Sequence, residues 1–301
     1  MTDRPISRFH QPSAESVAEL VARLKLTGDE PAVEALGGLP RACERFLNRH
    51  RNERDPIGSS AKHMQEAIEA RNTFGLDSDG INHGGASSEV RRKVGAVWPG
   101  FWVGRAPNGS PICHFAVGTL NAKQLCQQIS DEELRDFFLG FHTRGLGLQN
   151  LAHPPGTSSS GWCGTLEIFD LRGLSSEQLH LPGLLMLSKV LKLGAHLFCD
   201  NLGIAVVVNA PRIFHGAWSL LKRVLPPDTV AKVDIRADDG RDVLADLVGG
   251  ADALDALLAS RDDEFAAAQA GLFVLGVEAV AEVEEAPVEE ARAAERLSTT
   301  Q

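Results

Sequence analysis

The sequence predicts an α/β protein in which a helical lobe precedes a mostly parallel sheet. Residues 13–26 place Val17, Leu20 and Leu24 at helical spacing, which is typical of an amphipathic helix. From residue 111 onward, short apolar runs alternate with amphipathic stretches. Because strands separated by such helices are joined by crossovers, we expect most of them to pair in parallel.

The first lobe is expected to be helical throughout. Its helices are predicted behind the Ser13–Ser16 turn, from Pro31, and over residues 61–74. A stretch rich in Gly, Ser and Asp at residues 77–88 is the best internal boundary of the chain.

The second lobe is expected to alternate strands and helices. Strands are predicted over residues 111–117, 165–171, 204–209 and 233–235. The capping box Ser130–Glu133 opens one helix. Ser175–Gln178 is expected to cap another, which runs toward Leu193 with Pro182 disturbing its first turns. A second loop is expected at residues 152–161.

Composition excludes several classes of protein. Hydrophobic residues make up 43% and charged residues 23% of the 301-residue chain, so it is neither wholly disordered nor a coiled coil. A net charge of −10 argues against a dedicated nucleic-acid-binding protein. Five widely spaced cysteines favour a reducing compartment over a disulfide framework or a zinc ribbon. The first twenty residues lack the apolar core of a secretory signal, so we expect a cytoplasmic protein.

Shifts in composition suggest five segments along the chain. We predict an N-terminal segment, a helical lobe, an α/β domain, a C-terminal helix and an acidic tail, over residues 1–27, 28–88, 89–260, 261–277 and 278–301. The tail carries 7 acidic and 2 basic residues with few large apolar groups, and we expect it to be disordered.

The most informative segment lies between residues 200 and 235. A buried strand ends at Asn209-Ala210-Pro211, and a helix is expected from Ile213 to Leu225. Wound at about 100° per residue, this helix gathers its apolar side chains in an arc of about 160°, with Lys222 and Arg223 in its last turn. Such a helix can cover an apolar pocket, rest on anionic headgroups or pack on its own sheet, and periodicity alone favours the last.

A set of residues at fixed spacing runs through this segment: Asn209-Ala210-Pro211, Phe214, Trp218, Lys222, Leu225, Pro227, Thr229, Lys232 and Ile235. In their order and spacing these residues resemble the CRAL-TRIO lipid-binding family, most closely the fungal-type phosphatidylinositol transfer proteins. Weaker matches lie upstream at Arg45-Phe46-Leu47, Gly109-Ser110-Pro111 and Asp170-Leu171-Arg172-Gly173. The resemblance implies that residues 89–260 hold one lipid in an apolar cavity above the sheet. It also implies a mobile gate helix with the gate residues Ile213, Phe214, Ala217, Trp218, Leu221 and Leu225.

The resemblance further implies a site for an inositol phosphate headgroup. The family's acidic residue before the buried strand corresponds to Asp200, and its T-x-x-K pair corresponds to Thr229 and Lys232. A cation and a hydroxyl suit a phosphodiester, and a carboxylate accepts hydrogen bonds from inositol hydroxyls. Without the resemblance, Lys232 would be interpreted as a solvated surface lysine and Thr229 as a helix N-cap.

The family also uses an arginine from the helical lobe. The match places His50 at that position, between Arg49 and Arg51, and either arginine can substitute for it. For most of this basic run, a solvated surface is the plainer interpretation.

Two departures from the family affect ligand choice. Where the family binds phosphatidylcholine with strand hydroxyls and tyrosines, this chain has Thr165, Glu167 and no tyrosine, so we expect phosphatidylcholine binding to be lost or altered. Glu167 either faces the cavity as a polar anchor or points outward in a salt bridge. After residue 246 the chain lacks the family's L-P-x-x-Y-G-G stretch, so we expect its cavity to be closed differently.

We therefore predict a monomeric cytoplasmic protein that contacts membranes peripherally and acts in membrane trafficking. It is expected to carry one phospholipid, with phosphatidylinositol as the leading candidate, and to need no cofactor, metal or nucleic acid. The chain lacks the G-x-S-x-G, Walker A and H-E-x-x-H motifs, which argues against an enzyme. Two alternatives stay open: a membrane-linked regulatory or scaffolding module, and a carrier of a non-phospholipid apolar ligand.

Overall fold

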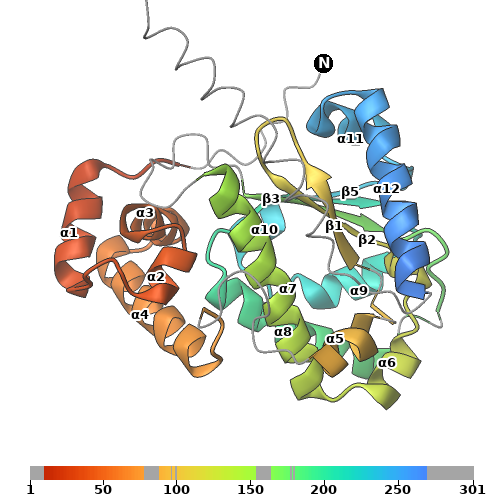
Figure 1. Cartoon of the computed structure of the whole chain (residues 1–301), viewed down its shortest axis with the longest axis horizontal. Helices are drawn as coiled ribbons and strands as arrows, with labels where there is room; N and C mark the ends of the chain where they lie inside the picture. The colour runs from red at the N-terminus through yellow and green to blue at the C-terminus, as the bar shows by residue number, and fades with distance from the viewer. Residues whose placement is uncertain are drawn as a thin grey trace, which may run out of the picture.

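A computed structural model describes residues 10–77, 88–95, 97–98, 100–153, 164–176, 178 and 180–269. Within these residues a helical lobe packs against one end of an α/β lobe (Figure 1). The predicted loops at 77–88 and 152–161 fall almost entirely outside the described residues, and the acidic tail at 278–301 falls wholly outside them.

The helical lobe consists of α1 (Ala14–Leu24), α2 (Pro31–Ala35), α3 (Leu39–His50) and α4 (Pro56–Thr73). As predicted, the Ser13 side chain caps α1 by accepting a hydrogen bond from the Ser16 backbone. The fourth helix begins before residue 61, because Asp55 caps it and Pro56 suits its first position. Since α1 packs on α3 and α4, it lies within this lobe and not in a separate segment ending at residue 27.

A five-stranded sheet forms the centre of the α/β lobe, in the spatial order β1-β2-β3-β4-β5. The strands are β1 (Gly100–Arg105), β2 (Pro111–Phe115), β3 (Thr165–Asp170), β4 (Leu202–Val208) and β5 (Val233–Ile235). The last four pair in parallel, which confirms the predicted mostly parallel sheet. The antiparallel edge strand β1 was not predicted, because Gly100 and Gly104 weaken its strand pattern and an irregularity interrupts its register.

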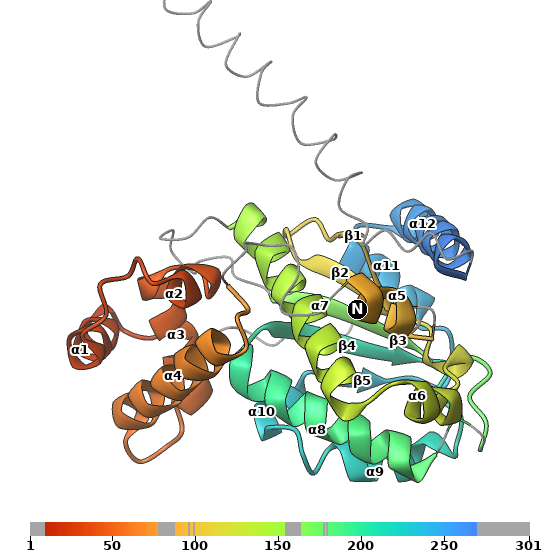
Figure 2. The same cartoon turned by 60° about the horizontal axis from the view of Figure 1, so that its bottom comes forward.

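Helices cover both faces of this sheet. They are α5 (Ser88–Gly95), α6 (Ala122–Gln128), α7 (Asp131–Ala152), α8 (Leu181–Leu197), α9 (Phe214–Leu221), α10 (Pro227–Ala231), α11 (Arg241–Val248) and α12 (Ala251–Gln269). Figure 2 shows α11 and α12 on one face and α7, α8 and α9 on the other. Because side chains alternate along a strand, Leu166 packs under α11 and α12 while its neighbour Glu167 faces the other layer.

Three further helices have boundaries that differ from the sequence-based expectation. The Ser175 backbone N–H and hydroxyl both donate to Gln178 Oε1, and this segment forms a turn. Helix α8 begins only at Leu181, so Pro182 lies in its first turn and does not disturb it. The predicted helix Ile213–Leu225 shortens to Phe214–Leu221. The helix α12 runs from Ala251 across the predicted boundary between residues 260 and 261.

The shortening of α9 has a local cause. Proline disfavours helical backbone in the residue before it, so the Pro226-Pro227 pair loosens the preceding turn. Lys222 and Arg223 therefore follow the helix in a turn, and the prediction that they lie in its last helical turn is wrong.

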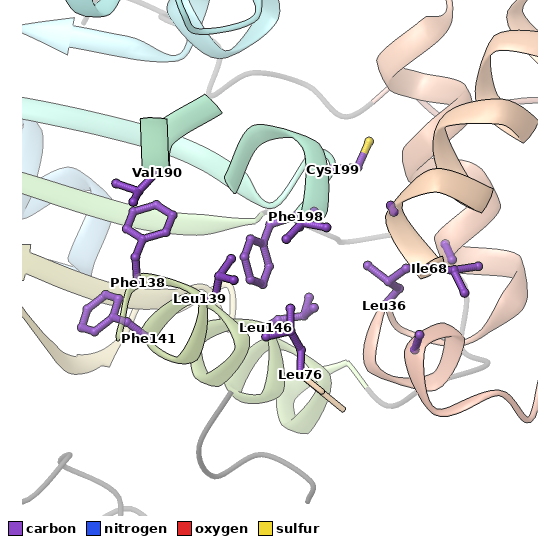
Figure 3. Close-up of a cluster of buried hydrophobic side chains, with 14 of the residues drawn as sticks. Leu36, Ile68, Leu76, Phe138, Leu139, Phe141, Leu146, Val190, Phe198 and Cys199 are labelled. Atoms are coloured by element: carbon purple, nitrogen blue, oxygen red, sulfur yellow. The ribbon is translucent and has the colours of Figure 1, made fainter. Parts of the chain in front are cut away.

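The two lobes share one hydrophobic core. Leu36 and Ile68 of the helical lobe lie in the same cluster as Leu146 of α7 and Phe198 at the end of α8 (Figure 3). Each fully buried side chain of this size contributes about 1.5–3 kcal/mol of hydrophobic stabilisation. The helical lobe is therefore packed against the α/β lobe and is not tethered to it by a linker alone.

Candidate functional site

A cavity of about 260 Å³ lies between the sheet and the helices α7, α8 and α9. The sheet and the surrounding helices both supply apolar side chains to its lining. They are Phe115, Phe169, Ala205 and Val207 from the strands, Phe138 from α7, Leu187, Leu191 and Phe198 from α8 and its end, and Phe214, Trp218 and Leu221 from α9. Such a lining favours an apolar ligand, because burying apolar surface is the main driving force for binding.

The segment predicted as a gate forms one wall of this cavity. Phe214, Trp218, Leu221 and Leu225 line it. Ala217 is buried beside Phe214 and packs on the sheet without lining the cavity, whereas Ile213 is 43% exposed on the outer surface. The structure thus brings four of the six predicted gate residues to the cavity.

Charged residues line the cavity where β4 and β5 begin. Asp200 precedes β4, and Thr229 and Lys232 come from α10 and its C-cap. The Lys232 ammonium lies 2.6 Å from Asp200 Oδ1 and donates to the Leu202 carbonyl at 2.6 Å. The two residues that the resemblance assigns to different parts of a headgroup are therefore paired with each other.

The helical lobe contributes to the same end of the cavity. Arg49 lines it, and its guanidinium lies 3.9 Å from Asp228 Oδ2. Arg51 does not line the cavity but donates to Asp228 at 3.1 Å. His50, at the family's arginine position, is hydrogen-bonded to Glu53 at 2.6 Å and does not line the cavity.

The structure answers the question that the sequence left open for Glu167. Its carboxyl group lines the cavity and forms no outward salt bridge within the described ranges. Burial raises the pKa of this carboxyl to about 7, and a hydrogen bond from Thr165 partly opposes the shift. Thr165 itself is buried behind the lining and donates to Glu167 Oε1 at 3.1 Å.

Three polar lining residues were missed by sequence reasoning: Asp228, described above as the partner of Arg49 and Arg51, and also His142 and Asn201. His142 follows the lining residue Phe138 by one helical turn of α7, and burial lowers the pKa of its imidazole to about 4. Asn201 is 4% exposed and lines the cavity directly after Asp200. The spacing from Phe138 was a usable indication for His142, whereas nothing in the sequence separates Asn201 from an ordinary loop asparagine.

The fold and its apolar cavity define a protein that encloses an apolar ligand. Residues 96–249 match the family model of the CRAL/TRIO domain, and the chain belongs to this family. Family membership supports lipid binding at a general level and leaves the lipid open.

Similar proteins agree with this assignment. A CRAL-TRIO domain-containing protein of Caenorhabditis elegans is 28% identical over 153 residues, which are 50% of this chain and 21% of that protein. Protein real-time of Anopheles gambiae is 27% identical over 140 residues, which are 46% of this chain and 20% of that protein. The chain thus spans about a fifth of the length of these curated relatives.

The crystal structure of Sfh5 has a similar fold. It superposes with a TM-score of 0.56 at 14% identity, covering 80% of this chain and 89% of that one. This likeness supports the fold alone.

In the part of the chain that the structure describes, no helix is long and apolar enough to span a membrane.

Proposed function

We propose that this chain binds one phospholipid in its cavity and transfers it between membranes without catalysing a reaction. The observation that carries the proposal is the combination of an apolar cavity, the helix α9 along one wall and charged groups at one end. The cavity of about 260 Å³ falls below the usual range for drug-sized ligands, so a two-chain lipid requires α9 to move outward.

Phosphatidylinositol is the phospholipid we propose first, because the resemblance to the fungal-type transfer proteins is carried by Thr229 and Lys232. In this proposal Lys232, Thr229 and Arg49 bind the phosphate, and Asp200 accepts hydrogen bonds from the inositol hydroxyls. The Lys232–Asp200 pair would then open as the headgroup enters. Arg51 acts by holding Asp228, and Thr165 acts by orienting Glu167.

We also propose a peripheral membrane contact through the first turns of α8 and α9. Leu181, Leu185 and Ile213 are large apolar side chains, exposed by 59%, 48% and 43%. The two helices contact each other, and they lie side by side in Figure 2. Exposed apolar groups next to a gate suit insertion among lipid headgroups. The proposal therefore includes a cytoplasmic monomer that docks on membranes reversibly.

One observation favours a second candidate, a carrier of a neutral apolar ligand. The cation expected to bind phosphate has a carboxylate partner within the chain, because Lys232 and Asp200 are 2.6 Å apart. A ligand without phosphate would leave that pair intact.

The test is organic extraction of the purified protein followed by mass spectrometry of the bound lipid. A stoichiometric amount of phosphatidylinositol, together with its transfer between vesicles, would support the headgroup assignment. A neutral apolar ligand would favour the second candidate. Recovery of no lipid, even after incubation with mixed liposomes, would contradict carriage and leave a regulatory or scaffolding role.

A further inference from the structure

Glu167 and Asn201 are two polar residues that line the same cavity as Lys232 and Asp200. The Thr165 hydroxyl lies 3.1 Å from Glu167 Oε1 and 3.4 Å from the Asn201 backbone carbonyl. The Thr165 hydroxyl therefore lies between the Glu167 carboxyl of β3 and the backbone carbonyl of Asn201, which precedes β4. Both residues line the cavity, and they are 9% and 4% exposed.

The donors in the described residues do not satisfy these acceptors. Asn201 Oδ1 is buried and has no hydrogen-bond partner in the described part of the chain. Within the same ranges, Glu167 accepts from Thr165 and has no lysine or arginine within ion-pair distance. Buried polar groups are nearly always hydrogen-bonded, and leaving one unpaired is costly. Since Asn201 lines the cavity, its unpaired side-chain acceptor indicates a ligand that donates.

Within the described residues the pKa of Glu167 is shifted by burial and by the Thr165 hydrogen bond, and by no neighbouring charge. Across the sheet, Cys113 of β2 is the register partner of Glu167, and its thiol is neutral because burial raises its pKa. His142 of α7 is neutral, since its pKa is lowered to about 4. Lys232 is paired with Asp200, so the negative charge that Glu167 gains as it ionises near pH 7 has no cationic partner of its own.

We propose that Glu167 and Asn201 form a subsite for the primary ammonium group of an aminophospholipid such as phosphatidylethanolamine. This inference rests on the proposed phospholipid carriage and adds a headgroup class to it. A primary ammonium brings one positive charge and three N–H donors, as the lysine side chain does. The quaternary ammonium of choline has the charge but no N–H, and would leave Asn201 Oδ1 unsatisfied.

The position of the subsite suits such a headgroup. Asn201 directly follows Asp200, the partner of Lys232, and Lys232 is the cation proposed to bind phosphate. In an ethanolamine headgroup, two carbons link the phosphate oxygen to the ammonium. In this proposal one headgroup places its phosphate at Lys232 and its ammonium at Glu167 and Asn201.

The test compares vesicle-to-vesicle transfer of five lipids with identical acyl chains. These are phosphatidylethanolamine, its N-methyl and N,N-dimethyl derivatives, phosphatidylcholine and phosphatidylinositol. Each methyl group removes one donor and keeps the charge, so transfer is expected to fall stepwise along the first four. Glu167→Gln keeps the size of the side chain and removes its charge, and should lower phosphatidylethanolamine loading about tenfold or more.

Two further measurements separate the outcomes. Loading of phosphatidylethanolamine should rise with pH across about 7, where Glu167 ionises, and become flat in Glu167→Gln. Asn201→Ala should weaken phosphatidylethanolamine loading, whereas Glu132→Gln on the exposed start of α7 should not.

Several results would overturn the subsite. Equal transfer of the four amine lipids would exclude an N–H-specific site, and transfer of phosphatidylinositol alone would assign the acceptors to hydroxyl groups. Transfer of none of the five lipids would instead contradict the proposed phospholipid carriage itself. Folding of each variant is checked by the coincidence of its thermal unfolding with that of the wild type.

Discussion

Burial changes the stability contributed by a single side chain, Glu167. The pKa of its carboxyl is about 7 in the folded protein, compared with 4.5 for an exposed glutamate. A raised pKa means that the folded state holds the proton more tightly, so stability is full below about pH 4.5 and is lost as pH rises through about 7. At about 1.4 kcal/mol per pKa unit, the loss reaches about 3 kcal/mol.

Urea unfolding of the lipid-free protein tests this expectation. Between about pH 5 and about pH 8 the wild type should lose up to about 3 kcal/mol more than Glu167→Gln, which cannot ionise. Glu132→Gln serves as the control, because that side chain is exposed. Identical pH dependence of the wild type and Glu167→Gln would mean that the carboxyl is solvated.

Lys232 is the cation that we expect to carry phosphate recognition. Lys232→Ala should weaken phosphatidylinositol loading by about 1.5–3 kcal/mol, the range for a hydrogen bond to a charged group. The matched control is Lys192→Ala, since Lys192 is exposed on α8. The measurement is equilibrium loading from vesicles at fixed ionic strength. A change no larger than that of the control would remove Lys232 from the headgroup site.

The residues predicted from family spacing and the residues found only in the structure differ in kind. Asp200, Thr229 and Lys232 lie within one short segment, so a local pattern could identify them, and all three line the cavity. Asn201 became a candidate only because its side-chain oxygen is buried without a partner. His142 lies on α7, far in sequence from the segment that holds Asp200, Thr229 and Lys232. Its position at the cavity depends on how α7 packs against α8. Sequence patterns do not encode such packing.

At the scale of single elements, α9 is the part expected to move. Its buried face packs through Phe214 and Ala217 against Leu171 and Val207. Ala217→Glu would place a charge in this contact, and burying an unpaired charge is strongly unfavourable. We expect the variant to hold α9 away from the sheet and to abolish lipid retention.

Ser219→Glu is the matched control for this variant. Ser219 lies two residues further along α9 and is exposed, so the same charge there should leave transfer nearly unchanged. Retention is measured as the lipid that stays bound during gel filtration, and transfer as its exchange between vesicles. If Ala217→Glu and Ser219→Glu retain lipid equally, α9 is an ordinary packed helix.

Elements with strong local patterns were predicted well, and elements defined by their partners were not. The Ser130–Glu133 capping box opens α7 as predicted, because both of its hydrogen bonds are local. The similar Ser175–Gln178 pattern forms only a turn, since the helix next to it begins at Leu181. The edge strand β1 has a weak pattern of its own and is defined by its pairing with β2.

At the scale of the whole molecule, the helical lobe caps the carboxyl end of α8. Carbonyl groups at the end of a helix lack partners within it. Here His63 contacts the His196 carbonyl at 3.0 Å, Arg71 donates to Leu197 at 3.4 Å, and Arg45 donates to Cys199 at 2.6 Å. The negative end of the helix dipole favours the two arginine cations, whereas burial lowers the pKa of His63 to about 4 and leaves it a neutral donor. One lobe therefore completes the secondary structure of the other.

This arrangement predicts that the two lobes unfold together. Arg45 is fully buried and also donates to the Leu36 carbonyl at 3.1 Å, so Arg45→Met leaves two carbonyl groups without this donor. We expect a loss of about 2–5 kcal/mol in stability, since each unpaired buried group costs about 1–3 kcal/mol.

Two probes test whether the loss is shared by both lobes. The four tryptophans lie beyond residue 97, so their fluorescence reports the α/β lobe, whereas circular dichroism reports helices of both lobes. In the wild type and in Arg45→Met the two transitions should coincide, because the lobes share one core and one helix end. Arg51→Met, which alters an exposed contact with Asp228, should shift both transitions far less. If Arg45→Met moves the dichroism transition below an unchanged fluorescence transition, the helical lobe unfolds as an independent unit. Asn48 of that lobe donates to Asp200 at 2.5 Å. Independent unfolding would therefore mean that Asp200 keeps its place at the cavity without this hydrogen bond.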